Sequence, residues 1–404
     1  MTAGIYIHIP FCVQKCAYCD FFSEDLGGEF FLGKKPPLSK NLHLYADKLC
    51  GDLKSAREAF ASPSACDAAD FAGVEIDTVY IGGGTPTALP AFLLCGILDA
   101  VRGLPLLPDA EITVEVNPGT VDAAYLAAIR AGGVNRLSVG AQTTHSHLLR
   151  ALGRIHTREE FFECFRDARA VGFDNINVDL MFALPGQTLA EWREDLDEIV
   201  ALSPEHISAY SLTPAENTPL YERLKRGEIV LPDDETDRNM YHHARARLAD
   251  AGFSHYEISN FARPGRESRH NVNCWTMRPY FGFGAGAHSF DGTARWSNPE
   301  NITAHRNEGF FGEVCPDGAG VVNGRPDGET FSSKKISPPE VLTQEKIILG
   351  LRMMRGVRED EFSAIYGEEI AGLIRDGLLA REDGRVFLTA RGMDLANLVF
   401  EAFL

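Results

Sequence analysis

The sequence of 404 residues is poor in positive charge, with 39 Lys and Arg against 57 Asp and Glu and a formal net charge of −18. This balance argues against sequence-independent binding to nucleic acid, which needs a basic face. Long apolar runs are missing too, since the best one, from Leu89 to Val101, is broken by Asp99, and no transmembrane segment is expected. The first residues lack the basic stretch of a signal peptide. We therefore expect a soluble intracellular protein, cytoplasmic or peripheral at the membrane.

The nine cysteines are a poor set for disulfides, because their number is odd and six of them are scattered. Clustered cysteines in a reducing compartment indicate a metal centre or catalysis instead. Cys12, Cys16 and Cys19 form such a cluster, with CxxxCxxC spacing. No second CxxC pair completes a structural zinc site, whereas three cysteines can hold a [4Fe–4S] cluster that leaves one iron open. Zinc, or a redox pair at Cys16 and Cys19, remains the alternative.

Short β-rich runs alternate with longer helical patterns along the first 250 residues. The predicted strands are Gly4–Ile9, Asp77–Ile81, Glu111–Val116, Arg136–Ala141, Ile176–Phe182 and His206–Leu212. The predicted helices are Leu42–Phe60, Ala91–Val101, Ala123–Ala131, Arg158–Val171, Leu189–Leu202 and Asp234–Ala251. Such alternation predicts parallel β/α units with right-handed crossovers. Because six units are visible rather than eight, the fold class is α/β with a partial (β/α)6 barrel.

Polar residues or glycines stand where these strands end. They are Cys12, Gly82-Gly83-Gly84-Thr85, Glu115, Gln142, Asp179 and Ser211. The carboxyl ends of parallel strands converge on one face, where the active sites of barrels form. We therefore expect the site there, with ordinary hydrogen bonds at the barrel rim as the alternative for each residue taken alone.

The whole chain divides into three predicted parts: residues 1–290 are the barrel with an extension, residues 291–337 are a loop or linker, and residues 338–404 are a small C-terminal domain. Residues 315–339 are rich in Gly, Pro, Asp and Ser, which favours a linker. Helices over Glu340–Met354, Asp360–Tyr366 and Ile370–Asp376, a hairpin over Leu378–Thr389 and a helix after Gly392 predict a winged-helix-like domain. Acids outnumber bases there, twelve to eight, so packing on the barrel is favoured over DNA binding.

The CxxxCxxC segment, with Tyr18 directly before its last cysteine, resembles the radical S-adenosylmethionine (SAM) superfamily. The resemblance implies that SAM chelates the open iron and is cleaved to methionine and a 5′-deoxyadenosyl radical by an electron that a donor supplies. The glycines at 82–84 resemble the motif of this superfamily at which bare backbone approaches the methionine amino group. A tight turn after the strand is the alternative.

A narrower resemblance covers most of the chain. Tyr6–Cys12, Gly82–Thr87, Glu115–Gly119, Leu152–His156, Leu184–Gly186 and His270–Trp275 together resemble the coproporphyrinogen III dehydrogenase-like group. The resemblance implies cluster ligands at Cys12, Cys16 and Cys19. It implies SAM contacts at Tyr6, Tyr18, Gly83, Gly84, Thr85, Glu115, Gln142, Arg154 and Asp179.

Two functions are known in that group. The dehydrogenase, which oxidatively decarboxylates two propionates, has a CxxxCxxCxC motif and a long N-terminal arm, whereas this sequence has Phe21 at the last position and eleven residues before Cys12. Both features resemble the haem chaperone (HemW) branch, which binds haem for delivery to haemoproteins such as respiratory enzymes. We therefore expect haem as cargo, with the dehydrogenase as the alternative. An unrelated radical SAM modification enzyme is the third hypothesis, so enzymatic activity is left open.

The branch carries an HNxxYW motif, and this sequence has Cys274 in place of its tyrosine. The resemblance implies that His270 is an axial haem contact, and a capped loop histidine is the alternative. Cys274 either adds a ligand or only loses the hydrogen bond of a tyrosine hydroxyl. The glycine-rich segment that ends at His288 lacks dinucleotide-binding spacing, and we expect it to pack near the barrel mouth.

Overall fold

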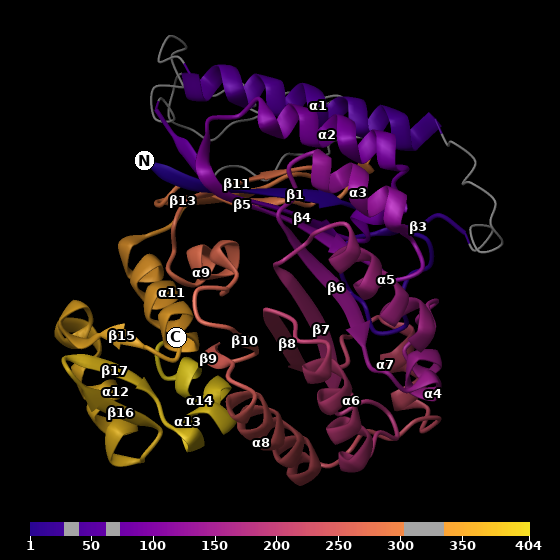
Figure 1. Ribbon diagram of the computed structural model, residues 1–404. Helices are drawn as coiled ribbons and strands as arrows, with labels where there is room; N and C mark the ends of the chain where they lie inside the picture. Colours follow the sequence, from indigo (N-terminus) through magenta and orange to yellow (C-terminus); the bar gives the residue numbers. More distant parts are fainter. Residues whose placement is uncertain (28–39, 62–72, 303–334) are drawn as a thin grey trace.

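The structure is a computed structural model that describes residues 1–27, 40–61, 73–302 and 335–404. Its main body is a curved sheet of twelve described strands in the order β14-β13-β12-β11-β1-β4-β5-β6-β7-β8-β10-β9. Helices cover the convex side of this sheet, and the C-terminal domain lies beside α9 (Figure 1). The fold is α/β with a mostly parallel sheet and a small second domain, as the sequence predicts.

The six predicted strands form the parallel part of the sheet. They are β1 (Thr2–Ile9), β4 (Glu75–Gly83), β5 (Leu106–Val116), β6 (Arg136–Gln142), β7 (Ile176–Phe182) and β8 (His206–Ser211). Three of them begin earlier than predicted, and Gly82 and Gly83 belong to β4 itself instead of following it. Cys12 lies in the two-residue strand β2 (Phe11–Cys12), which pairs with β3 (Glu24–Asp25).

The predicted helices are confirmed to within about two residues at each end, the normal uncertainty of helix boundaries. They are α1 (Lys40–Ala61), α2 (Ala91–Arg102), α3 (Ala123–Ala131), α5 (Arg158–Ala170), α6 (Leu189–Ala201) and α8 (Asp234–Asp250). Capping boxes of Thr157 with Glu160 and of Thr188 with Glu191 start α5 and α6. The short elements η3 (Pro86–Ala88), α4 (Ser146–Ala151), α7 (Pro219–Lys225) and α9 (Arg269–Trp275) were not predicted.

The two faces of β1 show how the sheet separates core from site. Ile5, Ile7 and Ile9 are fully buried in the hydrophobic core. Because side chains alternate along a strand, Tyr6 and His8 point to the other, concave face. The concave face therefore carries the polar side chains of the barrel interior.

The sheet extends well beyond the six predicted strands. β11 (Tyr280–Phe283) pairs in parallel with β1, and β12 (His288–Phe290), β13 (Ala294–Ser297) and β14 (Lys335–Ile336) follow antiparallel. At the other edge, β10 (Asn260–Ala262) and β9 (Ser254–Glu257) are antiparallel to β8 and to each other. The glycine-rich segment before His288 is therefore the end of a strand and its turn, at the mouth side of the sheet.

The C-terminal domain contains a three-stranded sheet and several helices. Its elements are α11 (Pro339–Arg352), β15 (Val357–Arg358), η4 (Glu359–Glu361), α12 (Ser363–Arg375), β16 (Leu379–Glu382), β17 (Arg385–Leu388), α13 (Ala390–Asp394) and α14 (Ala396–Glu401). The hairpin is confirmed. The two predicted middle helices are one element, interrupted at Tyr366, and the last helix begins before Gly392 and is split in two. The three domain boundaries stay a prediction, and most of the predicted linker lies outside the described residues.

The C-terminal domain is attached to the barrel by polar contacts. Arg295 of β13 donates two hydrogen bonds of 2.9 and 3.0 Å to one carboxylate oxygen of Glu345 on α11. Arg352, at the end of α11, lies 3.6 Å from the fully buried carboxylate of Glu257 and 4.4 Å from the ring centre of Trp275. These contacts bring α11 against α9.

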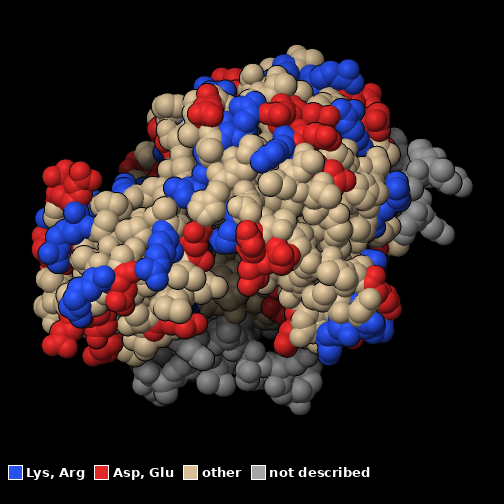
Figure 2. Space-filling view, turned by 90° about the horizontal axis from the view of Figure 1, so that it is seen from below, with Lys and Arg blue, Asp and Glu red and all other residues tan. Residues whose placement is uncertain are grey.

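The surface carries both signs of charge. Seen from below, Lys and Arg are interspersed with Asp and Glu, and this face is hollowed near its centre (Figure 2). Within the described residues, none of the helices combines the length and the apolar character needed to cross a bilayer.

Candidate functional site

The three clustered cysteines lie on one loop at the carboxyl end of β1. Cys12 is buried, and its sulfur accepts a hydrogen bond of 3.7 Å from the Thr85 hydroxyl. The sulfur of Cys16 accepts one of 3.5 Å from the Arg154 guanidinium. The amide of Cys19 donates to the Cys16 carbonyl at 3.3 Å. The loop thus lies against Thr85, just after β4, and against Arg154, in the loop after α4.

The backbone of this loop is fastened to distant parts of the chain. The amide of Ala17 donates to the Leu152 carbonyl at 2.9 Å, and the Ala17 carbonyl accepts from the Leu220 amide at 2.8 Å. Gly153 has φ +72°, and a Cβ there would lie 3.1 Å from the Ala17 nitrogen. Gly153 is therefore required both by its left-handed backbone and by the close approach of the loop.

Burial disfavours the charged form of two of the thiols. It raises the pKa of Cys12, and it raises the pKa of Cys19 to about 11, with the Cys16 and Cys12 charges adding to the effect. Within the described ranges, no three Cys, His, Asp or Glu side chains converge as the ligands of a single metal ion do. A cluster in which each cysteine binds its own iron does not need that convergence, so the donor set fits one.

The glycines at the end of β4 and directly after it meet the protein's own groups at close range. A Cβ on Gly83, whose φ is +111°, would lie 2.5 Å from the His8 ring, and one on Gly84 would lie 2.8 Å from the Phe11 carbonyl oxygen. The Gly84 amide donates to the Ile9 carbonyl at 2.9 Å. The bare backbone here is required by packing against β1 and β2, beside the cysteine loop.

Two predicted carboxylates line the concave face. Glu115 accepts hydrogen bonds from the Tyr80 hydroxyl at 2.9 Å and the Gly83 amide at 3.2 Å. Burial raises the pKa of Glu115 to about 7. Asp179 accepts from Ser138 at 2.9 Å and from the Asn177 amide at 2.8 Å. A carboxylate at either position has the chemistry to accept hydrogen bonds from hydroxyl or amino groups.

Arg154 joins several strand ends. One of its nitrogens donates to the Gly140 carbonyl at 2.7 Å and to the Asn117 side-chain oxygen at 2.8 Å, and another reaches the Cys16 sulfur. Its Nε is buried without a partner in the described part of the chain. Gln142, with φ +64°, is the last residue of β6. A Cβ on Gly140 would lie 3.0 Å from the side-chain nitrogen of Gln142 and 3.1 Å from a guanidinium nitrogen of Arg154, so both side chains lie over Gly140.

The two predicted tyrosines occupy different surroundings. The Tyr6 hydroxyl shares a 2.9 Å hydrogen bond with Nδ1 of His8, whose Nε2 lies 2.9 Å from the Phe22 carbonyl. Tyr18, between Cys16 and Cys19, packs against a small apolar cluster that includes Met181. Burial raises the pKa of both tyrosines.

His270 is held inside the barrel. Its Nδ1 lies 3.0 Å from the Thr78 hydroxyl, and its ring centre lies 5.3 Å from that of Tyr80 and 6.5 Å from that of Tyr6. The amide of His270 donates to Glu111, which caps the start of α9. Burial lowers the pKa of His270 to about 4. The side chain is neutral at physiological pH and is already fully packed.

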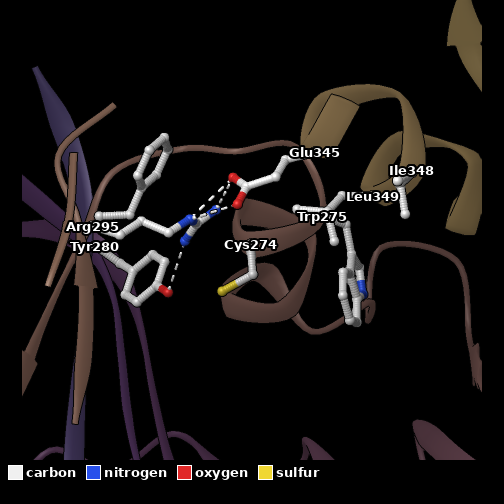
Figure 3. A pocket seen from close by; sticks show the side chains of 8 residues that line it. Cys274, Trp275, Tyr280, Arg295, Glu345, Ile348 and Leu349 are labelled. Atoms are coloured by element: carbon white, nitrogen blue, oxygen red, sulfur yellow. Dashed lines mark hydrogen bonds and ion pairs between the residues drawn. The ribbon is translucent and has the colours of Figure 1, made fainter. Parts of the chain in front are cut away.

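Cys274 faces a different space, a cavity of about 330 Å³ between α9, β11–β13 and α11. The lining residues are Cys274, Trp275, Tyr280, Phe290, Arg295, Glu345, Ile348 and Leu349. Figure 3 shows the Cys274 sulfur directed toward Tyr280, with Trp275 on the opposite side. Burial raises the pKa of Cys274 to about 11. His270 does not line this cavity, so the structure does not bring the two predicted haem residues to one common space.

Two residues that contribute to the site were not predicted from the sequence. Asn117, which accepts from Arg154, stands two residues after Glu115 in a segment that was noted for its resemblance. His8 faces the interior two residues after Tyr6, and strand alternation alone could have indicated it.

Two family models match the chain. The Radical SAM superfamily model matches residues 6–199, and the HemN C-terminal domain model matches residues 337–395. The first range holds the cysteine loop and the other predicted SAM contacts.

Full-length relatives narrow the assignment. The chain is 34% identical over 409 residues to Heme chaperone HemW of Bacillus subtilis, covering 99% of this chain and 98% of that protein. It is 40% identical to Heme chaperone HemW of Escherichia coli over 286 residues, 70% of this chain and 69% of that protein. The fold is that of coproporphyrinogen III oxidase (HemN) from Escherichia coli, with a TM-score of 0.74 over 100% of this chain and 89% of that one, at 22% identity.

These findings agree with the predicted resemblance, and membership of the superfamily implies a [4Fe–4S] cluster and SAM. The chain therefore belongs to the HemN-like group of the radical SAM superfamily and is a HemW-like member of it.

Proposed function

We propose that this protein binds haem and delivers it to haemoproteins such as respiratory enzymes. The observation that carries the proposal is the relationship, over almost the whole of both chains, to proteins named Heme chaperone HemW. Phe21 supports it, because the dehydrogenase motif has a further cysteine at that position. A location in the cytoplasm, with or without peripheral contact to the membrane, remains a prediction.

Cys12, Cys16 and Cys19 are the proposed cluster ligands. The Thr85 hydroxyl and the Arg154 guanidinium donate to two of these sulfurs, and such donors favour thiolates over thiols. When bound, the cluster and SAM supply one-electron chemistry. The chain's own task is to hold both and to keep water away from them.

The proposed SAM contacts come from several strand ends of the barrel. Gly83 and Gly84 lie beside the cysteine loop, the Thr85 hydroxyl donates to the Cys12 sulfur, and Glu115 and Asp179 offer acceptors for hydroxyl and amino protons. Arg154 offers a cation for the SAM carboxylate, and its unpartnered Nε is available to it. Tyr6, Tyr18 and Gln142 complete the set at the rim.

His270 and Cys274 are the proposed haem contacts, and each must change before it can bind haem iron. A contact through His270 requires its ring to leave Thr78 and the two tyrosines. Cys274 needs no such movement, because it already lines a cavity, but its thiol must lose a proton to ligate iron.

The second candidate is an oxygen-independent coproporphyrinogen III dehydrogenase. The observation in its favour is the similarity of fold to HemN over the whole chain. Fold alone does not determine chemistry, so the test must be chemical.

The test has two arms on the full chain with its cluster reconstituted anaerobically. In the first, haemin is titrated into the protein, and transfer to an apo-haemoprotein is followed by recovery of that protein's activity. In the second, coproporphyrinogen III, SAM and reductant are added, and the products are analysed. Saturable haem binding with transfer and no decarboxylation supports the proposal. Formation of protoporphyrinogen would establish the dehydrogenase instead.

A further inference from the structure

Two of the proposed cluster ligands receive hydrogen bonds from side chains outside the cysteine loop. The Thr85 hydroxyl donates to the Cys12 sulfur at 3.7 Å, and the Arg154 guanidinium donates to the Cys16 sulfur at 3.5 Å. Both Cys12 and Thr85 are buried. A hydrogen bond that is shielded from water is electrostatically stronger than one at the surface. One donor is a neutral hydroxyl and the other is a cation, so the two sulfurs differ in their surroundings.

Arg154 uses separate nitrogens for the sulfur and for its own support. One terminal nitrogen donates to the Asn117 side-chain oxygen at 2.8 Å and to the Gly140 carbonyl at 2.7 Å. The other terminal nitrogen donates to the Cys16 sulfur. Because a guanidinium is planar and rigid, holding one of its nitrogens at two points also fixes the direction of the other. Both supporting oxygens are neutral, so they do not cancel the positive charge beside the sulfur.

Asn117, which follows β5, is itself held by a closed ring of hydrogen bonds. Its amide donates to the Thr87 hydroxyl at 3.4 Å, and its carbonyl accepts from the Thr120 hydroxyl at 2.6 Å. The two hydroxyl oxygens lie 2.7 Å apart. Since Thr120 gives its proton to Asn117, Thr87 donates to Thr120 and the ring closes. Thr87 stands two residues after Thr85, so the same short segment supports Asn117 and reaches a cluster cysteine.

Donors to cysteine sulfur influence how readily a [4Fe–4S] cluster accepts an electron. Reduction adds one negative charge, and hydrogen bonds to the sulfurs together with nearby positive charge stabilise the more negative form. Such donors therefore raise the reduction potential. Charge-assisted hydrogen bonds are about twice as strong as neutral ones, so the arginine should contribute more than the threonine.

We infer that Thr85 and Arg154 raise the reduction potential of the proposed cluster by donating to its cysteine sulfurs. Asn117 is the positioning residue that keeps the guanidinium directed at Cys16. The inference rests on the cluster ligands named in the proposed function. The step concerned is the transfer of one electron: an external donor is oxidised, the cluster is reduced, and no covalent bond is made or broken. The two side chains thus set how strong a reductant that donor must be.

The test measures the reduction potential of the full-length protein with its cluster reconstituted anaerobically and without SAM. Potentials come from redox titration followed by the paramagnetic resonance signal of the reduced cluster. Thr85→Val removes the hydroxyl donor, Arg154→Gln removes the charge, and Asn117→Leu removes the acceptor. Asn135→Leu is the matched control, because Asn135 also accepts a hydrogen bond but stands before β6, at the end of the strand away from the cysteine loop.

The expected shifts differ between the variants. At a fixed electrode potential, the ratio of reduced to oxidised cluster should fall about threefold in Thr85→Val and about tenfold in Arg154→Gln, a tenfold change being about 59 mV for one electron. Asn117→Leu should lower the potential by a smaller amount, and Asn135→Leu should leave it unchanged. The double variant of Asn117→Leu and Arg154→Gln should match Arg154→Gln alone, because no guanidinium is left to position. Additive shifts would remove the positioning role from Asn117.

Two conservative variants keep the test decisive where a larger change prevents cluster assembly. Thr85→Ser retains the hydroxyl and Arg154→Lys retains the charge, so both should stay near the wild-type potential. Iron and sulfide content shows whether each protein carries its cluster. Wild-type potentials in Thr85→Val and Arg154→Gln at full iron content would overturn the inference. A wild-type protein that binds no cluster would overturn the proposed ligands as well, whereas haem titration tests the proposed cargo separately, so these failures are distinguishable.

Discussion

Gly153 offers a sharp test of how the cysteine loop is positioned. Its substitution by alanine has two consequences: a left-handed residue acquires a Cβ, and that Cβ lies 3.1 Å from the Ala17 nitrogen. The first costs about 1–2 kcal/mol of folding free energy. The second displaces the hydrogen bond from Ala17 to Leu152, worth ~1 kcal/mol. We expect Gly153→Ala to lose about 2–3 kcal/mol in total.

Gly265 provides the matched control. It has φ +75°, close to the +72° of Gly153, but a Cβ there would have nothing within 4 Å. Gly265→Ala should therefore lose only the conformational part, about 1–2 kcal/mol. Urea unfolding measures both losses, and iron and sulfide content after reconstitution measures the cluster. Only Gly153→Ala should fall below half of the wild-type content; equal stability loss and full content in both variants would refute the reasoning.

Three further predictions concern single side chains. Burial raises the pKa of Glu115 to about 7, so the stability that its protonated carboxyl contributes is lost as pH rises through that value. In urea unfolding without the cofactors, Glu115→Gln should be more stable than the wild type by up to ~3 kcal/mol at about pH 8, and equally stable below the usual carboxyl pKa. Arg352→Ala leaves the buried Glu257 without its cation, so it should lower the free energy of unfolding by about 3 kcal/mol and make the C-terminal domain sensitive to limited proteolysis. Unchanged protease resistance would contradict this. Cys274→Tyr should change the free energy of unfolding by less than ~1 kcal/mol, since the tyrosine enters an existing cavity, whereas Cys164→Tyr in the packed core should lower it by about 3 kcal/mol. Similar losses in both variants, measured by thermal unfolding, would count against the cavity.

The long periodic elements were predictable from sequence because their patterns are local. The alternating apolar run Ile5-Tyr6-Ile7-His8-Ile9 predicts a strand wherever it lies in the chain, and the Thr157 and Thr188 boxes mark helix starts. The extension β11–β14 was not predictable in the same way. Its strands are two to four residues long, and β11 contains a glycine, so pairing with β1 rather than propensity forms it.

For the site, motif spacing predicted which residues come together but not how they are engaged. Cys12 is bonded to Thr85, Cys16 to Arg154 and Gly83 to Glu115, because parallel strand ends meet. That Arg154 already binds Asn117 and a backbone carbonyl is a fact of tertiary structure. The enclosure of His270 likewise depends on Tyr6, Thr78 and Tyr80, which come from two other strands.

The parallel pairing of β1 with β11 has a consequence for synthesis on the ribosome. Gly4 pairs with Tyr280, 276 positions later (280 minus 4). At about 5–20 residues per second, one edge of the first strand waits for tens of seconds. Among the backbone partners of the cysteine loop in the described residues, Leu220 lies furthest along the chain. The nascent chain can therefore complete the backbone contacts of its cysteine loop well before β11 exists to pair with β1.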